Sequence, residues 1–138
     1  LSARADRIDR LHDGELALYD YKTGHIPTAK EVAVFAKQMP LMAAIAEAVG
    51  FNGIAAAPVS TLAHISLSGG RDGGRTVPLE GDPAAMAAET WSRLLGLIER
   101  FRDPATGYLA RARPRHLRYV SDYDHLSRLG EWEDGSGD

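Results

Sequence analysis

Residues 16–24 read LALYDYKTG, and this stretch decides how the rest of the chain is interpreted. Side chains alternate between the two faces of an extended strand. One face would therefore carry, in order, Leu16, Leu18, Asp20 and Lys22. The pattern predicts a strand whose apolar face ends in a carboxylate and an ammonium group.

The segment before this strand is predicted to be its hairpin partner. Residues 3–11 (ARADRIDRL) and residues 15–23 (ELALYDYKT) both have strand-like patterns. The HDG sequence between them contains Asp-Gly, which is a strong hairpin signal. We therefore expect an antiparallel hairpin over residues 3–23.

The length of the hairpin loop decides which acid of the first strand faces Asp20. A three-residue HDG loop would set Asp6 opposite Asp20, whereas a two-residue loop would bring Asp9 onto that face. We prefer the longer loop, because it aligns Ile8 with Leu18. The choice between Asp6 and Asp9 stays open to a one-residue slip of the hairpin.

Helical signals follow the hairpin. Thr28 and Glu31 have the spacing of a capping box. Apolar residues then recur at helical intervals until Gly50, which would end the helix. Pro40 lies inside this stretch, and we expect it to kink the helix or divide it.

The second half of the chain predicts a further strand and a further helix. Residues 53–68 favour a third strand, and the glycine-rich residues 68–75 favour a turn or loop. Residues 82–103 begin with Asp-Pro, a helix-start signal, and we expect this helix to pack on the sheet. Its apolar residues are Met86, Trp91, Leu94, Leu95, Ile98 and Phe101.

Composition limits the classes that the chain can belong to. Its 138 residues, of which 44% are hydrophobic, are enough for one core. The chain has no cysteine, which excludes disulfides and thiolate metal sites and fits a reducing compartment. No apolar run approaches the ~20 residues needed to span a bilayer. We expect a cytoplasmic domain, and the start at LSARAD suggests a piece of a longer protein.

Charge is segregated although the net charge is only −3. Residues 100–118 contain six arginines and one acid, whereas residues 122–138 contain six acids and one arginine. Such a basic stretch is either a solvated surface or a set of contacts to a DNA backbone. The candidate DNA contacts are Arg111, Arg113, Arg115 and Arg118. We expect a domain over residues 1–128 and a polar tail over residues 129–138.

The end of the predicted strand has the residue types of a magnesium site. Mg²⁺ prefers carboxylates, carbonyls and water as ligands. Asp20 would supply one ligand, the Tyr21 carbonyl a further one, and Lys22 a cation beside them. Two carboxylates facing each other across adjacent strands repel each other unless a cation lies between them. The sequence therefore predicts a metal at this position.

Three motifs in this order resemble a known family. They are RADRID (residues 4–9), DYKTG (residues 20–24) and KQMPL (residues 37–41). The set resembles the RecB-like branch of the PD-(D/E)XK nuclease superfamily, and within it the C-terminal nuclease domains of AddB-like helicase–nuclease subunits. The resemblance implies an α/β fold, with a mixed sheet flanked by helices and the N-terminal part of the domain absent.

The resemblance also implies roles for individual residues. Asp6 and Asp20 would be metal ligands, Lys22 the catalytic lysine, and Gln38 a residue near the active site. The implied activity is Mg²⁺-dependent DNA cleavage, with Mn²⁺ as a possible substitute, in double-strand break repair and recombination. The implied partners are DNA and an AddA-like helicase–nuclease subunit, and the implied location is cytoplasmic and nucleoid-associated. Met42 stands where the family usually has a tyrosine.

One further run departs from the family. Residues 121–128 (SDYDHLSR) resemble a cysteine motif that binds an iron–sulfur cluster, with Ser121 and Ser127 in the cysteine positions. Thiolates are the normal ligands of such clusters, so we expect none here. Two alternatives remain, a catalytically silent module that binds DNA or a partner subunit, and a plain protein-interaction domain. His64 is interpreted as a structural residue of the third strand.

Overall fold

The computed structural model describes residues 3–69 and 74–107. Within these residues the chain forms a four-stranded sheet in the order β1-β2-β3-β4. The strands are β1 (Arg7–Arg10), β2 (Leu16–Lys22), β3 (Val59–Ser66) and β4 (Thr76–Pro78). The β2–β3 pair is parallel and the other two pairs are antiparallel. The predicted α/β architecture with a mixed sheet is therefore confirmed.

The hairpin has the register that the longer loop requires. Ile8 pairs with Leu18, and Leu11 N donates to Glu15 O at 2.9 Å. Gly14 closes the loop with a φ of 89°, a left-handed conformation that costs glycine little. The strands are shorter than predicted, because β1 has only 4 residues and β2 has 7.

Two helices connect the parallel strands β2 and β3. α1 (Ala29–Val34) begins at Thr28, and both hydrogen bonds of the predicted capping box with Glu31 are present. α2 (Gln38–Ala48) follows after a short break, with Pro40 in its first turn. The first turn tolerates proline because its N–H groups have no partner within the helix. The predicted division of the helix is therefore confirmed.

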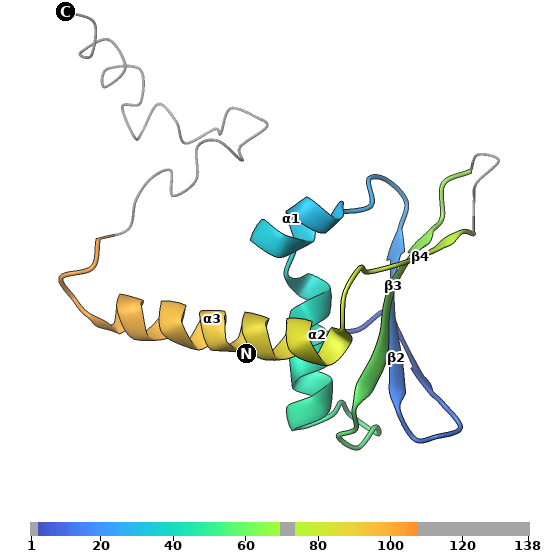
Figure 1. Cartoon of the computed structure of the whole chain (residues 1–138), viewed down its shortest axis with the longest axis horizontal. Coiled ribbons are helices and arrows are strands. Elements are labelled where there is room, and N and C mark those ends of the chain that lie inside the picture. The colour runs from blue at the N-terminus through green and yellow to red at the C-terminus, as the bar shows by residue number, and fades with distance from the viewer. Residues whose placement is uncertain (1–2, 70–73, 108–138) are drawn as a thin grey trace, which may run out of the picture. The chain divides into compact units, whose positions relative to one another are not determined.

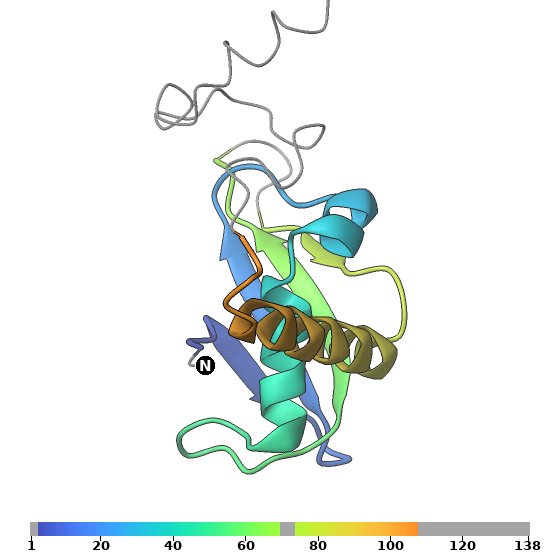
Figure 2. The ribbon, with the colours of Figure 1, turned by 90° about the vertical axis from the view of Figure 1, so that its left-hand side faces the viewer.

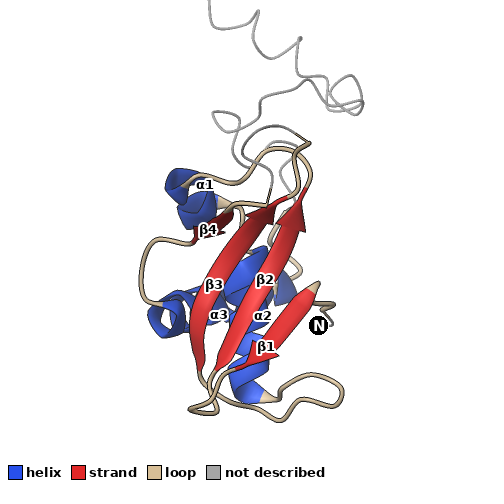
Figure 3. Cartoon of the chain, turned by 90° about the vertical axis from the view of Figure 1, so that its right-hand side faces the viewer, coloured by secondary structure: helices blue, strands red, loops and turns tan. Residues whose placement is uncertain are grey.

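The hydrophobic core lies between the sheet and α2. Leu16 and Leu18 of β2 and Leu62 of β3 form one buried cluster with Met39 and Met42 of α2. Each of these side chains is at most 2% exposed. The helices lie on one face of the sheet, so that this face carries the core (Figures 1 and 3).

The last helix, α3 (Pro83–Arg102), begins where the sequence predicts, but its packing differs from the prediction. Its early residues lie beside α2 (Figures 1 and 2). Ala87 joins the core, whereas Trp91, Leu95 and Ile98 are between 38% and 50% exposed. The expectation that its apolar residues pack on the sheet is therefore wrong. Strand β4 was not predicted either.

The chain divides into two compact units, residues 1–98 and residues 99–138. In the second unit the described residues contain the end of α3 and a turn in which Thr106 N donates to Asp103 O. The predicted DNA contacts Arg111, Arg113, Arg115 and Arg118, the SDYDHLSR run and the polar tail lie outside the described residues. None of the helices in the described part is long and apolar enough to cross a membrane.

Candidate active site

Asp20 is a buried carboxylate near the carboxyl end of β2, and it is only 2% exposed. Three side chains from three elements contact it. Gln38 Nε2 donates to Oδ1 at 2.9 Å. Lys22 Nζ and His64 Nδ1 both lie close to Oδ2, at 2.8 Å and 3.1 Å. Buried carboxylates are retained where they are paired and hydrogen-bonded, as this one is.

Lys22 and Gln38 also contact each other. Lys22 Nζ donates to Gln38 Oε1 at 3.5 Å. Lys22 comes from β2, two residues after Asp20, and Gln38 is the first residue of α2. The division of the helix before α2 thus places Gln38 over the end of β2. The structure brings together Asp20, Lys22 and Gln38, as the sequence predicts, and their roles remain proposals.

His64 completes this group, and sequence reasoning missed it. The parallel register pairs His64 of β3 with Asp20 of β2. The imidazole is 4% exposed, and this burial lowers its pKa. The Asp20 carboxylate opposes the shift, and Lys22 adds to it. The only signal in the sequence was a histidine in the same alternating row as buried Leu62, in a strand of otherwise apolar and small side chains.

Asp6 lies beside this group but does not join its hydrogen-bond network. Asp6 Oδ2 accepts a hydrogen bond from Tyr21 N at 3.0 Å, so its carboxylate lies one peptide unit from Asp20. The register pairs Arg7 with Tyr19, and its continuation by one residue sets Asp6 beside Asp20. Continuing the alternation of β1 by one residue puts Asp6 on the face of Ile8, which packs against the core.

Asp9 is engaged elsewhere. Arg7 forms a bidentate contact with it, in which Nε donates to Oδ1 at 2.8 Å and Nη2 donates to Oδ2 at 2.6 Å. Arg7 also lies over the ring of Tyr19, 5.1 Å from its centre. The hydrogen bond from Arg7 lowers the pKa of Asp9 below its usual range. Asp9 therefore faces the opposite side of the sheet from Asp20.

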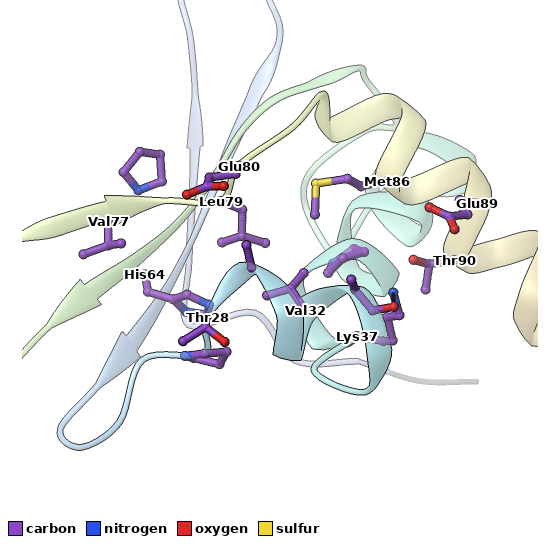
Figure 4. Close-up of a pocket in the computed structure, with 15 residues that line it drawn as sticks. Thr28, Val32, Lys37, His64, Val77, Leu79, Glu80, Met86, Glu89 and Thr90 are labelled. Atoms are coloured by element: carbon purple, nitrogen blue, oxygen red, sulfur yellow. Dashed lines mark hydrogen bonds between the residues drawn. The ribbon is translucent and has the colours of Figure 1, made fainter. Parts of the chain in front are cut away.

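A cavity of about 430 Å³ adjoins the group on the side of α1. His64 and Thr28 lie at one edge of it, and Met86 and Thr90 of α3 lie at another (Figure 4). Of the three partners of Asp20, only His64 lines this cavity. The cavity and the carboxylate group are thus neighbours that share one side chain.

The oxygen donors around Asp20 are of the kind that bind hard divalent metal ions. Asp20 and Asp6 supply carboxylates, and the Tyr21 main chain runs between them, so all the donors are hard oxygen atoms. Mg²⁺ is typically held by one or two carboxylates and keeps several waters. The described residues contain no group of three or more His, Cys, Asp or Glu that could hold a metal.

The fold and the site together define an α/β domain with a carboxylate–lysine centre at the carboxyl ends of two parallel strands. The model of the PD-(D/E)XK nuclease superfamily matches residues 1–108, and the chain belongs to this superfamily. Nucleases of this superfamily generally use divalent metal ions. No curated protein and no solved structure matches the chain.

Proposed function

We propose that the chain is the catalytic domain of a Mg²⁺-dependent DNA nuclease, which hydrolyses phosphodiester bonds. The observation that carries this proposal is the convergence of Lys22, Gln38 and His64 on the buried carboxylate of Asp20. Burying the carboxylate of Asp20 beside a cation lowers the stability of the fold, because the charge must lose its hydration. Because the chain belongs to a nuclease superfamily, we interpret this arrangement as catalytic.

Asp20, Asp6 and the Tyr21 carbonyl would hold Mg²⁺, with Mn²⁺ as a substitute. Such an ion supplies Lewis-acid polarisation of the phosphodiester and lowers the pKa of water that it binds. The ammonium of Lys22 would orient the attacking water and stabilise the negative charge that develops on the phosphoryl oxygens in the transition state. Gln38 holds Oδ1 of Asp20 and restrains Lys22, so it sets the geometry of both.

The wider context is also part of the proposal. We place the chain in an AddB-like subunit of a helicase–nuclease that acts on double-strand breaks, with an AddA-like subunit as its partner. The arguments are the three motifs and the arginine-rich residues 100–118, whose side chains Arg111, Arg113, Arg115 and Arg118 would contact the DNA backbone. On this proposal the domain extends to residue 128, and residues 129–138 form a tail.

The test is cleavage of end-labelled linear DNA by the purified chain in Mg²⁺, with EDTA as the metal-free control. Asp20→Asn and Asp20→Ala should both abolish cleavage, since each removes a negative ligand. Glu89→Gln is the control, because Glu89 is an exposed acid that pairs with Arg93 along α3 and has no contact with Asp20 among the described residues. It should cleave like the wild type.

Other outcomes point to other functions. Equal cleavage by the wild type and both Asp20 variants would assign the activity to a contaminant or another site. A folded wild type that binds DNA without cleaving it would favour the catalytically silent module. Failure to bind DNA even at low salt would favour a protein-interaction domain, because phosphate contacts strengthen as salt falls.

A further inference from the structure

His64 is the partner of Asp20 that the proposed reaction does not yet use. We propose that His64 is a positioning residue, which donates its Nδ1–H to Asp20 Oδ2 and keeps that oxygen paired when Lys22 turns toward the phosphodiester. The inference rests on the proposed nuclease function. It adds to the site a residue on β3, a strand that carries none of the three motifs.

The argument starts from the two oxygens of Asp20. Oδ1 has Gln38 as its donor, whereas Oδ2 is shared by Lys22 Nζ at 2.8 Å and His64 Nδ1 at 3.1 Å. If Lys22 turns toward a substrate phosphate, its contact with Oδ2 lengthens or breaks. Without a second donor, that oxygen would be left unpaired in a buried position, which is costly.

The two donors differ in their freedom to move. The Lys22 side chain is 27% exposed and has a flexible four-carbon stem. The His64 side chain is 5% exposed, and the parallel register holds its backbone directly beside Asp20. Lys22 is therefore the donor that can leave, and His64 is the donor that stays. The hydrogen bond from His64 would keep the Asp20 carboxylate in one orientation throughout the reaction.

The position of the imidazole proton gives a first test, which needs neither metal nor DNA. The proposal requires a proton on Nδ1 of His64 in the metal-free chain. Two-dimensional ¹H–¹⁵N spectra of the ring nitrogens report this directly, and His64→Asn identifies the signals. A ring with its proton on Nε2 alone would overturn the proposal, because Nδ1 could then only accept a hydrogen bond, and so does the carboxylate.

Metal affinity gives the second test, with Mn²⁺ measured by electron paramagnetic resonance and Mg²⁺ by calorimetry. We expect His64→Ala to weaken the binding of both ions by roughly tenfold, the size expected for the loss of one hydrogen bond to a charged group. His64→Asn retains an N–H donor at short reach and should recover most of the affinity. His12→Ala, in the exposed hairpin loop, is the matched control and should bind like the wild type.

Two results would overturn the inference while the nuclease proposal stands. In the first, the wild type binds metal and cleaves DNA, and His64→Ala does both equally well. In the second, His64→Ala weakens the affinity for Mn²⁺ far more than the affinity for Mg²⁺, and His64→Asn does not restore either affinity. That result would make His64 a metal ligand itself. A folded wild type that binds neither ion would instead overturn the proposed function, and the ring-nitrogen spectra would still decide whether Nδ1 donates to Asp20.

Discussion

Two acid–base pairs with the same sequence spacing lie on neighbouring strands of the hairpin, and their surroundings are opposite. Arg7 and Asp9 meet at 2.6 Å, and their side chains are 48% and 34% exposed. Lys22 and Asp20 meet at 2.8 Å, but their side chains are 27% and 3% exposed. Nearly the same contact distance therefore occurs once in water and once at the edge of the core.

The difference teaches that burial of the carboxylate, rather than the ion pair itself, distinguishes the pair that we propose to be functional. Exposed ion pairs contribute little, because water and salt screen them. Asp20 in contrast is buried and has donors from β2, β3 and α2. In the sequence, the apolar Leu16 and Leu18 before Asp20 distinguish the two pairs, since the same alternation carries Asp20 inward.

The strongest test of this comparison removes the cation from each pair while keeping an unbranched apolar stem. Lys22→Met should lower the rate of Mg²⁺-dependent DNA cleavage by about 100-fold or more, since it removes a charge that stabilises the transition state. Arg7→Met should change the rate by less than about twofold, because its charge faces the other side of the sheet and water screens it. Steady-state cleavage rates of the two variants measure the contrast. Similar losses in both would contradict it.

Gln38 gives a smaller effect that sharpens the account of Asp20. Gln38→Ala removes the donor to Oδ1 and the contact with Lys22, and we expect about a tenfold loss of cleavage rate, the size of one hydrogen bond to a charged group. Lys30→Ala, on the exposed surface of α1, is the control. An unchanged rate in Gln38→Ala would show that Asp20 does not need this donor.

Glu31 is a third carboxylate, held by hydrogen bonds at the start of α1 with no role in the proposed chemistry. The backbone N–H of Thr28 is the main reason that its pKa falls to about 2, and His25 adds to the effect. A lowered pKa in the folded state stabilises the fold above the unfolded pKa, and this stabilisation is lost as the pH falls through the folded value.

At neutral pH the melting temperature of the wild type should therefore be higher than that of Glu31→Gln. This difference in melting temperature should disappear between about pH 4.5 and about pH 2. Thermal unfolding of both proteins across this range measures it. The difference is expected to be small, because the carboxylate acts on a single helix cap. A difference that stays constant down to pH 2 would mean that the charge of Glu31 contributes nothing.

Local patterns predicted the parts of the fold that local physics determines. The HDG turn predicted the hairpin, the alignment of Ile8 with Leu18 favoured the register that is observed, and the Thr28–Glu31 spacing predicted the start of α1. Pro40 indicated the division of the helix, and this division places Gln38 at the site. These features depend on residues that are close together in the chain, so their signals are complete in the sequence.

The features that were missed depend on distant parts of the chain. His64 meets Asp20 only through the parallel register of β2 and β3, which periodicity within one strand does not determine. The three residues of β4 are too few to show an alternation. In α3 the helical period predicts which residues form an apolar face, but it does not predict what covers Trp91 and Leu95.

The most direct test of the central claim compares Asp6→Ala with Asp9→Ala in Mg²⁺-dependent cleavage of linear DNA. The two acids lie three residues apart on one strand, and only the hairpin register decides which of them lies beside Asp20. We predict that Asp6→Ala loses cleavage and that Asp9→Ala, which loses only an exposed pair with Arg7, cleaves like the wild type. Loss of cleavage in Asp9→Ala with retention in Asp6→Ala would contradict this account of the active site.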